Sequence, residues 1–468
     1  MGLYIANGVS ATAVENYIRE CSENGIFIRA LQVVKGKEPM LRIAFEPYDF
    51  TSPMHLYSLS KSFTSTAVGI CVDEGLLSPQ TKMCELFADK MPEEMTDALR
   101  KVTLHDLLSM QSGHTACVLD KIRWADDTVK AFFEQPTTYE PGTVFAYSTA
   151  ATCMCAAAVE RVTGKKLVDF LDERLFKKLG IEKPVWRECK SGQTLGGTGL
   201  ELSSDDITKF GMMLKNKGVY NGERIVSEEY LALATSHHSI DVNNGAPDWT
   251  AGYGYQFWLN DREGYRGDGA FGQLCMVFPI NDTVVTVMGE VGNMALDVQL
   301  VYKLLDTMYG ENCDSSSLEA LTKTAYAAKK SCDFNNDLSF TVAENKAGVN
   351  TLRIFGEKLL HVEMNTDYGK KEFVCGNGEY ILNHYMIKNL VPSITFLDPA
   401  VDTVERVSVY AAYEIADDGK ITVTLRHKNT CHVQRWVIDV AENKVDIKLH
   451  VGDMICNHFD LAPITNEE

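Results

Sequence analysis

The sequence predicts an α+β protein: an antiparallel sheet flanked by helices, with an inserted helical subdomain, followed by a β-rich, barrel-like domain. Three observations lead to this prediction. The 468-residue chain is too long for one ordinary hydrophobic core. Its first part reads as a helix, two strands, a helical block, further strands and a closing helix. Near residue 311 the pattern changes to a series of short alternating runs.

The start of the chain predicts a helix, a hairpin and a second helix. Residues 10–25 carry apolar side chains at helical spacing and end at a glycine. Two apolar runs within residues 26–45 surround a Gly-Lys turn, which is typical of a β-hairpin. Residues 57–75 then read as a helix that a glycine ends.

A helical block follows the second helix. To about residue 190 the apolar residues recur mostly at helical spacing, and glycines mark the ends of the segments. Residues 201–218 predict one more helix, in which Ser203 or Ser204 is the N-cap before an acidic first turn.

Strands return after this block. Residues 253–261 read as a strand, residues 273–291 as a hairpin, and residues 294–310 as a closing helix. Strands from both ends of residues 1–310 would therefore form one sheet, and the helical block would be an insertion between them.

The last third of the chain predicts a separate domain. Residues 311–334 read as a connector with a short helix, and residues 335–468 as short β-patterned runs separated by turn signals. We expect this domain to be a barrel or a strongly curved sheet. Its sequence carries no obvious chemistry, so stability, dimerisation and shaping of an active-site rim are all open roles.

Composition and charge exclude several classes of protein. Hydrophobic residues make up 45% and charged residues 23% of the chain, which are values typical of a soluble globular protein. The formal net charge of -19 argues against nucleic acid and against an anionic membrane surface as partners, because both would repel the chain.

Targeting signals and cysteine usage indicate a compartment. The N-terminus lacks the basic start and the apolar stretch of a secretion signal, and no run of about 18 apolar residues could span a membrane. Thirteen cysteines without paired metal spacing are typical of free thiols in a reducing cytoplasm. We expect a cytoplasmic protein that uses no metal or organic cofactor.

The second predicted helix begins with a serine and a lysine three positions apart. Residues 57–70 read "YSLSKSFTSTAVGI", with Ser58 and Lys61 at the helix entrance. Residues three apart share a helix face, so the Lys61 amine can reach the Ser58 hydroxyl, which is a weak nucleophile until a base removes its proton. The spacing alone does not decide, because Ser58 could equally be an N-cap and Lys61 a solvated lysine.

Two later stretches of the sequence favour the catalytic interpretation of Ser58 and Lys61. Residues 147–149 (YST) lie between a Pro-Gly turn and a helix, and residues 267–269 (GDG) immediately precede a strand. In this order the three motifs resemble those of the serine β-lactamase and penicillin-binding protein superfamily, in particular class C β-lactamases and related esterases. That family carries Ser-x-x-Lys, then Tyr-x-Asn, then Lys-Thr-Gly or His-x-Gly, and the resemblance spans roughly residues 25–308.

The resemblance implies a role for each motif. Ser58 would form an acyl-enzyme, and Lys61 and Tyr147 would share the proton transfers, with either one as the base. The backbone N–H groups of Ser58 and Ala270 would stabilise the oxyanion, and the third-motif glycines would let substrate approach the strand closely. His114 follows a loop that lines the site in relatives, which leaves a binding role for it open. The expected substrate-binding and oxyanion residues are Thr149, Gly267, Asp268, Gly269 and Ala270.

The motifs also depart from the family pattern. Thr149 stands where β-lactamases have Asn, and a hydroxyl cannot replace both contacts of an amide. Gly267 stands where relatives place Lys or His, and Asp268 follows it, so attraction for an anionic β-lactam would be weak. Arg266 could supply a replacement charge. The Arg-Gly-Asp spelling of residues 266–268 is treated as chance.

These observations favour an esterase- or amidase-type serine hydrolase that acts on a small ester, amide or peptide. A true β-lactamase and a D-aminopeptidase or D,D-carboxypeptidase-like enzyme would use the same residues. A catalytically silent binding protein that kept the fold is the alternative from another class, motivated by the altered second and third motifs. Homo-oligomerisation is left open.

Overall fold

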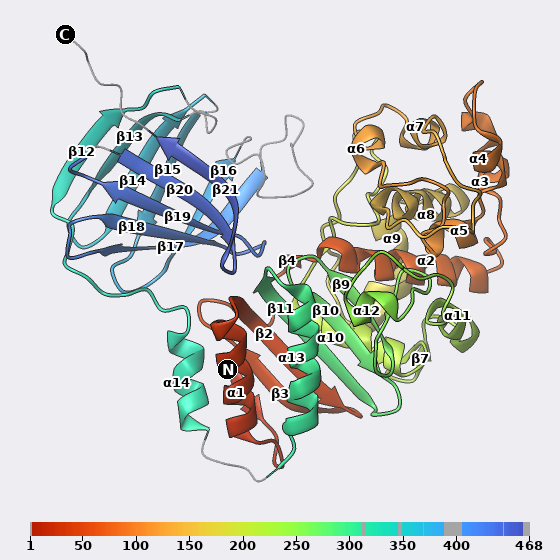
Figure 1. Ribbon diagram of the computed structural model, residues 1–468, viewed down its shortest axis with the longest axis horizontal. Coiled ribbons are helices and arrows are strands. Elements are labelled where there is room, and N and C mark those ends of the chain that lie inside the picture. Colours follow the sequence, from red (N-terminus) through yellow and green to blue (C-terminus); the bar gives the residue numbers. More distant parts are fainter. Residues whose placement is uncertain are drawn as a thin grey trace.

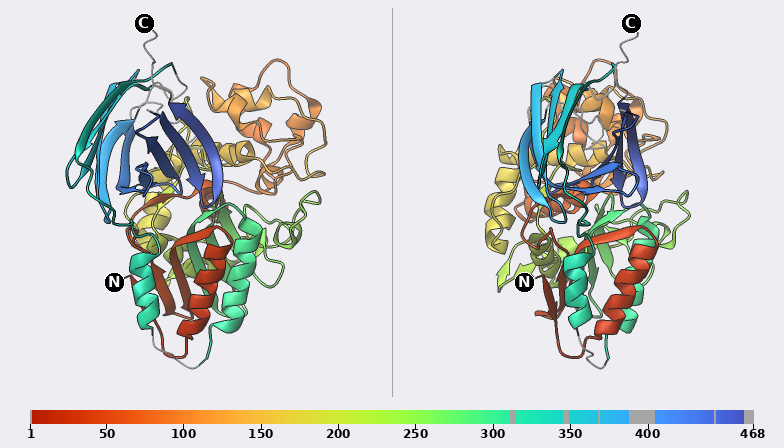
Figure 2. Two further views of the ribbon diagram at one scale, coloured as in Figure 1. Left: turned by 60° about the vertical axis from the view of Figure 1, so that its left-hand side comes forward. Right: turned by 90° about the vertical axis from the view of Figure 1, so that its left-hand side faces the viewer.

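The computed structural model describes residues 2–310, 315–344, 349–367, 369–387, 405–442 and 444–461. A central sheet carries helices on both faces, and a helical block and the C-terminal sheets both lie beyond the same end of it (Figure 1). Figure 2 shows the same arrangement from two further sides.

The central sheet has seven antiparallel strands in the order β1-β3-β2-β11-β10-β9-β8. The hairpin of β2 and β3 pairs through β2 with β11, so strands from both ends of the N-terminal part meet in one sheet, as predicted. The strands are β1 (Leu3–Ile5), β2 (Ile26–Lys35), β3 (Glu38–Ala44), β8 (Trp258–Leu259), β9 (Tyr265–Gly269), β10 (Gln273–Phe278) and β11 (Thr283–Val291).

Helices α1 (Ala11–Glu23) and α13 (Met294–Thr307) pack together against one face of this sheet. The side chain of Ser10 caps α1 by accepting a hydrogen bond from the Ala13 N–H. Along β10, Leu274 packs into the core on this side, whereas Cys275 packs into the core on the other. The sheet is therefore buried on both faces, which explains its nearly continuous apolar strands.

The other face packs against α10 (Ser204–Lys215) and the inserted helical block. Ser203 caps α10 in a capping box with Asp206, which confirms the predicted N-cap. In the block, α2 (Ser60–Asp73) is buried along most of its length and packs against α8 (Thr149–Thr163).

Shorter elements complete this part of the chain. The helices are η1 (Tyr57–Leu59), α3 (Met83–Leu86), η2 (Ala88–Lys90), α4 (Asp97–Lys101), α5 (Leu104–Leu108), α6 (Leu119–Ile122), α7 (Thr128–Phe133), α9 (Leu167–Leu171), η3 (Asp172–Phe176), η4 (Lys177–Leu179), α11 (Glu228–Ala234), α12 (Pro247–Thr250) and α14 (Ser316–Thr324). Two-stranded pairs join β4 (Met54–His55) to β5 (Glu201–Leu202) and β6 (Val219–Tyr220) to β7 (Glu223–Arg224). No helix in the described ranges has both the length and the apolar character that crossing a bilayer requires.

The C-terminal domain consists of two antiparallel sheets whose apolar faces share one core. Among the described strands, the hydrogen bonding does not close into a barrel, so a pair of facing sheets replaces the closed form of the prediction. The first sheet contains β12 (Asn336–Thr341), β13 (Val349–Gly356), β14 (Leu360–Thr366) and β15 (Gly369–Cys375), and the second contains β16 (Ile381–Ile387), β17 (Glu405–Ile415), β18 (Ile421–His427), β19 (Val433–Asp439), β20 (Lys444–Val451) and β21 (Met454–Leu461).

Two local predictions differ from the structure. The segment 253–261 forms only the two-residue strand β8, because most of it is taken up by loop contacts such as the Tyr253 pairing with Ser239. Residues 267–269 do not merely precede a strand: they end β9 itself, paired in register with β10. Glycines at this edge are compatible with a strand because other chain segments approach it closely, as described below.

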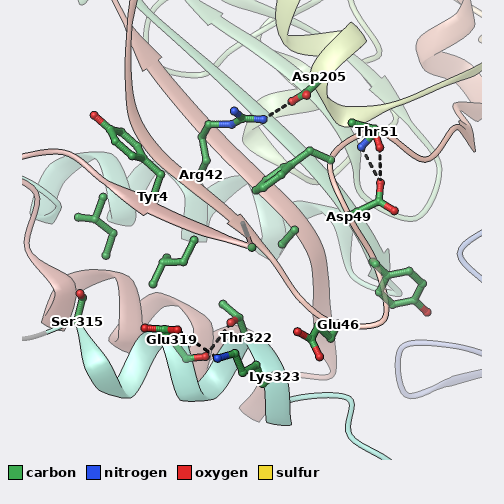
Figure 3. A pocket seen from close by; sticks show the side chains of 16 residues that line it. Tyr4, Arg42, Glu46, Asp49, Thr51, Asp205, Ser315, Glu319, Thr322 and Lys323 are labelled. Atoms are coloured by element: carbon green, nitrogen blue, oxygen red, sulfur yellow. Dashed lines mark hydrogen bonds and ion pairs between the residues drawn. The ribbon is translucent and has the colours of Figure 1, made fainter. Parts of the chain in front are cut away.

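A polar groove of about 990 Å³ follows the β1 edge of the sheet and α14 (Figure 3). Arg42 and Asp205 form an ion pair of 2.6 Å at its wall, and Glu319 and Lys323 line the opposite side. The groove lies at the far edge of the sheet from β9, so it is separate from the site of the three motifs.

Candidate active site

Ser58 lies in the short helix η1, which continues directly into α2. Lys61 is in the first turn of α2, and its Nζ donates a hydrogen bond to Ser58 Oγ at 2.9 Å. The side chain of Ser58 caps neither helix, since the N-cap residues are Leu56 and Leu59. The spacing of three residues therefore brings the hydroxyl and the amine together as the helix geometry predicts.

The Lys61 amine is held by two further acceptors. Its Nζ lies 3.1 Å from Thr149 Oγ1 and 2.8 Å from the carbonyl oxygen of Gly197. The residue is only 1% exposed, and burial lowers the pKa of Lys61 to about 7, although the nearby Asp268 carboxylate opposes this shift. A substantial fraction of this amine is therefore neutral at neutral pH, which is the form that can accept a proton.

Tyr147 completes the cluster. The centre of its ring lies 4.9 Å from Lys61 Nζ, and the ring stacks on Trp258 at 5.6 Å. Burial raises the pKa of Tyr147 far above its ordinary value, and a hydrogen bond with the Ser58 side chain only partly offsets this rise. The structure thus brings Ser58, Lys61 and Tyr147 together, with the phenol held in its protonated form.

The turn between β9 and β10 lies beside the nucleophile helix. Within the described residues, the backbone N–H of Ala270 has no hydrogen-bond partner, and Ser58 lies at a helix start, where N–H groups lack intrahelical acceptors. The aromatic rings next to these two residues are in contact: Tyr57 and Phe271 meet edge to face at 5.1 Å. The residues that follow and precede these rings in the chain, Ser58 and Ala270, are the two expected oxyanion donors.

The space beside the third-motif glycines is filled by other residues of the protein. We had expected this space to be open to substrate. A Cβ on Gly267 would lie 2.5 Å from Leu59 Cδ1 and 2.5 Å from Ser62 Oγ. A Cβ on Gly269 would lie 2.0 Å from the carbonyl oxygen of Leu56. The segment that carries Ser58 thus occupies both spaces, and this close packing leaves no room at position 267 for the Lys or His of the family motif.

Asp268 and Arg266 neutralise each other inside the protein. Arg266 is 0% exposed; its Nε donates to Asp268 Oδ2 at 3.1 Å, and its other nitrogens bond Leu259, Asn260 and the carbonyl of Asp248. Burial raises the pKa of Asp268, and the Arg266 charge opposes this rise. Arg266 is therefore not placed to supply the missing substrate-binding charge, and the Arg-Gly-Asp tripeptide is not displayed on the surface.

His114 is a buried histidine of the helical block. Its Nδ1 lies 3.0 Å from Ser112 Oγ, and its ring packs against Phe132. Burial lowers the pKa of His114 to about 4, so the ring is neutral at neutral pH. These contacts explain His114 as a packing residue and lend no support to the binding role expected from relatives.

Three neighbours of the cluster were not identified from the sequence. Gly197, the acceptor for Lys61, lies in the run GGTG, whose glycine density was a signal of close backbone approach. Trp258 stacks on Tyr147, and the exposed Cys117 interacts electrostatically with Lys61. Nothing in the local sequence distinguishes the tryptophan or the cysteine, because each reaches the site only through folding.

The sheet, the inserted helical block and the Ser-Lys-Tyr cluster together define a hydrolase of the serine β-lactamase fold. The comparison with family models gives the particular family: the chain belongs to the Beta-lactamase family, whose model matches residues 14–295, more than half of the sequence. The resemblance stated from the three motifs is thereby confirmed.

Individual relatives agree with this assignment. The chain is 27% identical over 298 residues to a 6-aminohexanoate-dimer hydrolase of Paenarthrobacter ureafaciens, covering 56% of this chain and 72% of that protein. It is 26% identical over 306 residues to a lovastatin esterase of Penicillium rubens, covering 50% of this chain and 76% of that protein. The solved structure of a family VIII carboxylesterase has a similar fold, with a TM-score of 0.52 and 16% identity over 65% of this chain and 100% of that one.

Proposed function

We propose that the protein is an esterase- or amidase-type serine hydrolase that forms an acyl-enzyme on Ser58. One observation carries the proposal: the amine of the buried Lys61 lies 2.9 Å from the hydroxyl of Ser58, within reach of its proton. Burial lowers the pKa of Lys61 to about 7, so its neutral form is available to accept that proton. An ordinary solvated lysine would be protonated and could not act as a base at neutral pH. The similarity to a lovastatin esterase and to a 6-aminohexanoate-dimer hydrolase supports the reaction class.

The geometry supports an order of proton transfers. Neutral Lys61 accepts the proton of Ser58 as Oγ forms a bond to the substrate carbonyl carbon, and the N–H groups of Ser58 and Ala270 stabilise the resulting oxyanion. The protonated phenol of Tyr147 then gives its proton to the leaving alcohol or amine as the ester or amide bond breaks. The ammonium of Lys61 returns a proton to Tyr147. Water then attacks the acyl carbon, the bond between that carbon and Ser58 Oγ breaks, and a proton of the water restores the Ser58 hydroxyl as the acid leaves.

The charges around the site favour a substrate without a carboxylate at the third motif. Gly267 contributes no cation, and the charge of the buried Arg266 is compensated by Asp268, so neither residue offers a positive charge to a substrate anion. We therefore propose a small neutral ester or amide as substrate, and poor turnover of anionic β-lactams.

Parallel assays distinguish these substrates. We expect hydrolysis of short-chain p-nitrophenyl esters and negligible hydrolysis of nitrocefin by the same preparation, with Ser58→Ala as the background control. Nitrocefin turnover as fast as ester turnover would instead support a true β-lactamase. Release of D-alanine from a D-Ala-D-Ala peptide, without ester turnover, would support a peptidase.

Acylation separates the enzyme from a binding protein that kept the fold. A fluorophosphonate probe should label the wild type at Ser58, as mapped by mass spectrometry, and should not label Ser58→Ala. If the folded wild type stays unlabelled and hydrolyses none of the substrates, the non-catalytic alternative replaces this proposal.

A further inference from the structure

The two residues that flank the oxyanion donors have unusual backbone conformations. Tyr57 precedes Ser58 and has a φ of 48°, and Phe271 follows Ala270 and has a φ of 68°. Bulky residues seldom adopt positive φ, and such conformations persist only where surrounding contacts enforce them. The two rings are buried and meet edge to face, so the conformations of both donor segments are coupled.

A turn of the C-terminal domain contacts both of these residues. It consists of residues 428–432, between β18 and β19, and is called the 428–432 turn. Its Cys431 Sγ lies 3.3 Å from the hydroxyl of Tyr57, and the ring of its His432 lies 5.7 Å from the ring of Phe271. Cys431 and His432 are both 0% exposed. The turn therefore packs against the two residues that are next to Ser58 and Ala270 in the chain.

The 428–432 turn is itself held by the central sheet. Arg29 of β2 donates from Nη1 to the carbonyl oxygens of His427 at 3.1 Å and Thr430 at 2.6 Å, and its Nε donates to Glu290 of β11. The carbonyl of Asn429 accepts from the His55 N–H at 2.8 Å, within the segment that leads to the nucleophile. These bonds fix the start and the middle of the turn to β2 and to the segment that precedes Ser58.

We propose that the 428–432 turn positions the oxyanion hole, with Cys431 and His432 as positioning residues that act through Tyr57 and Phe271. This inference rests on the proposed function, because it assigns a part in the Ser58 reaction to the C-terminal domain. A turn that only stabilised the fold would need no contact with both strained residues. By holding both Tyr57 and Phe271, the turn keeps the N–H groups of Ser58 and Ala270 directed at one point before substrate binds. Such preorganised donors are the condition for oxyanion stabilisation.

Substitutions in the turn separate positioning from stability. Cys431→Ala removes the contact with the Tyr57 hydroxyl, Cys431→Ser keeps a hydrogen-bonding group there, and His432→Ala removes the contact with Phe271. Cys375→Ala is the matched control, because Cys375 is equally buried in the core of the C-terminal domain but does not belong to the turn. Tyr57→Phe removes the same contact as Cys431→Ala from the other side.

We expect Cys431→Ala and His432→Ala each to lower kcat for a p-nitrophenyl ester by about 10-fold while KM changes by less than about twofold, since a misdirected donor weakens only the transition state. Cys431→Ser should recover most of the loss. Cys375→Ala should lower the melting temperature without this change in kcat. Tyr57→Phe combined with Cys431→Ala should lose no more than either alone, since both remove one contact.

Fluorophosphonate labelling of Ser58 in the wild type is measured first. A wild type that neither labels nor hydrolyses esters overturns the proposed function and this inference with it. A wild type that labels, with turn variants that match its kcat, overturns the inference alone. The same follows if every variant, including Cys375→Ala, loses activity only in proportion to its unfolded fraction.

Discussion

Burial acts in opposite directions on the pKa values of Lys61 and Tyr147. Both side chains have ordinary pKa values near 10, and burial acts on both. It disfavours the charged form of each, so the pKa of Lys61 falls to about 7 while the pKa of Tyr147 rises. The sequence left either residue as the base. The opposite shifts support Lys61 as the proton acceptor and Tyr147 as the donor.

The pH dependence follows from the sign of the Lys61 shift. The base must be unprotonated, so kcat/KM for an ester should fall by about tenfold per pH unit below a midpoint near 7 and level off above it. The measurement is ester hydrolysis between about pH 5 and about pH 9, corrected with Ser58→Ala. A midpoint near that of a free lysine would show that the amine is not the base.

Thr149 should support Lys61 through its hydroxyl. Thr149→Val keeps the shape but removes the acceptor 3.1 Å from Lys61 Nζ, so we expect kcat to fall by about 10-fold, in line with a hydrogen bond to an ionisable group. Thr149→Ser retains the hydroxyl and should stay within about threefold of the wild type. Equal losses in both variants would indicate that the methyl packing, and not the hydroxyl, matters.

At the scale of elements, the site depends on how closely β9 approaches η1 and α2. Gly267 and Gly269 are separated by one residue on the strand, and the space that each missing Cβ leaves is filled by atoms of residues 56–62. Strand β9 can thus approach η1 and α2 closely, whereas a side chain at position 267 or 269 would hold the strand and the helices apart. The glycine at position 267 therefore has two consequences: it removes the positive charge of the family motif, and it allows this close packing.

Gly269→Ala tests this approach. The added Cβ would meet the carbonyl oxygen of Leu56, a backbone atom that cannot move without the nucleophile segment, so stability should fall by about 1–3 kcal/mol and ester turnover should fall with it. Gly245→Ala is the control, because no atom lies within 4 Å of the position that its added Cβ would take, and its φ is not positive. The measurements are thermal unfolding and kcat for both variants. Equal stability and equal kcat of Gly269→Ala and Gly245→Ala would contradict the importance of this close packing.

At the scale of the whole molecule, a buried charge network joins the central sheet to the C-terminal domain. Glu290 of β11 accepts from Arg29 of β2 at 2.9 Å and lies 3.3 Å from Nη1 of Arg426 on β18. The hydroxyl of Tyr48 donates to the same carboxylate at 3.0 Å. One carboxylate thus compensates two guanidinium groups away from water, which makes it costly to remove.

Glu290→Gln should therefore lower the free energy of unfolding by about 3–5 kcal/mol, because two buried cations lose their counter-charge. The control is Asp306→Asn, which breaks the exposed ion pair with Arg262 and should cost less than about 1 kcal/mol. Urea unfolding followed by tryptophan fluorescence gives both values. Comparable losses would show that the buried network contributes no more than a surface pair.

Much of the fold was predictable because its elements carry local signals. Helices α1 and α10 have capping serines, and the hairpins of β2 and β3 and of β10 and β11 have turn residues between apolar runs. The domain limits near residues 310 and 334 stay predictions. Strand β8 was overestimated, because the apolar and aromatic residues of that segment serve packing around Tyr147 and not sheet pairing.

The sequence by itself determined the candidate nucleophile, its amine and its phenol, since short motifs in a set order need only local spacing to be recognised. Only the tertiary structure decided that burial shifts the pKa values of the amine and the phenol in opposite directions. It also decided what fills the space beside the third-motif glycines, and that residues 428–432 contact Tyr57 and Phe271. The physical reason is that burial, close approach and charge compensation depend on atoms hundreds of residues apart, and no local pattern encodes which of them meet.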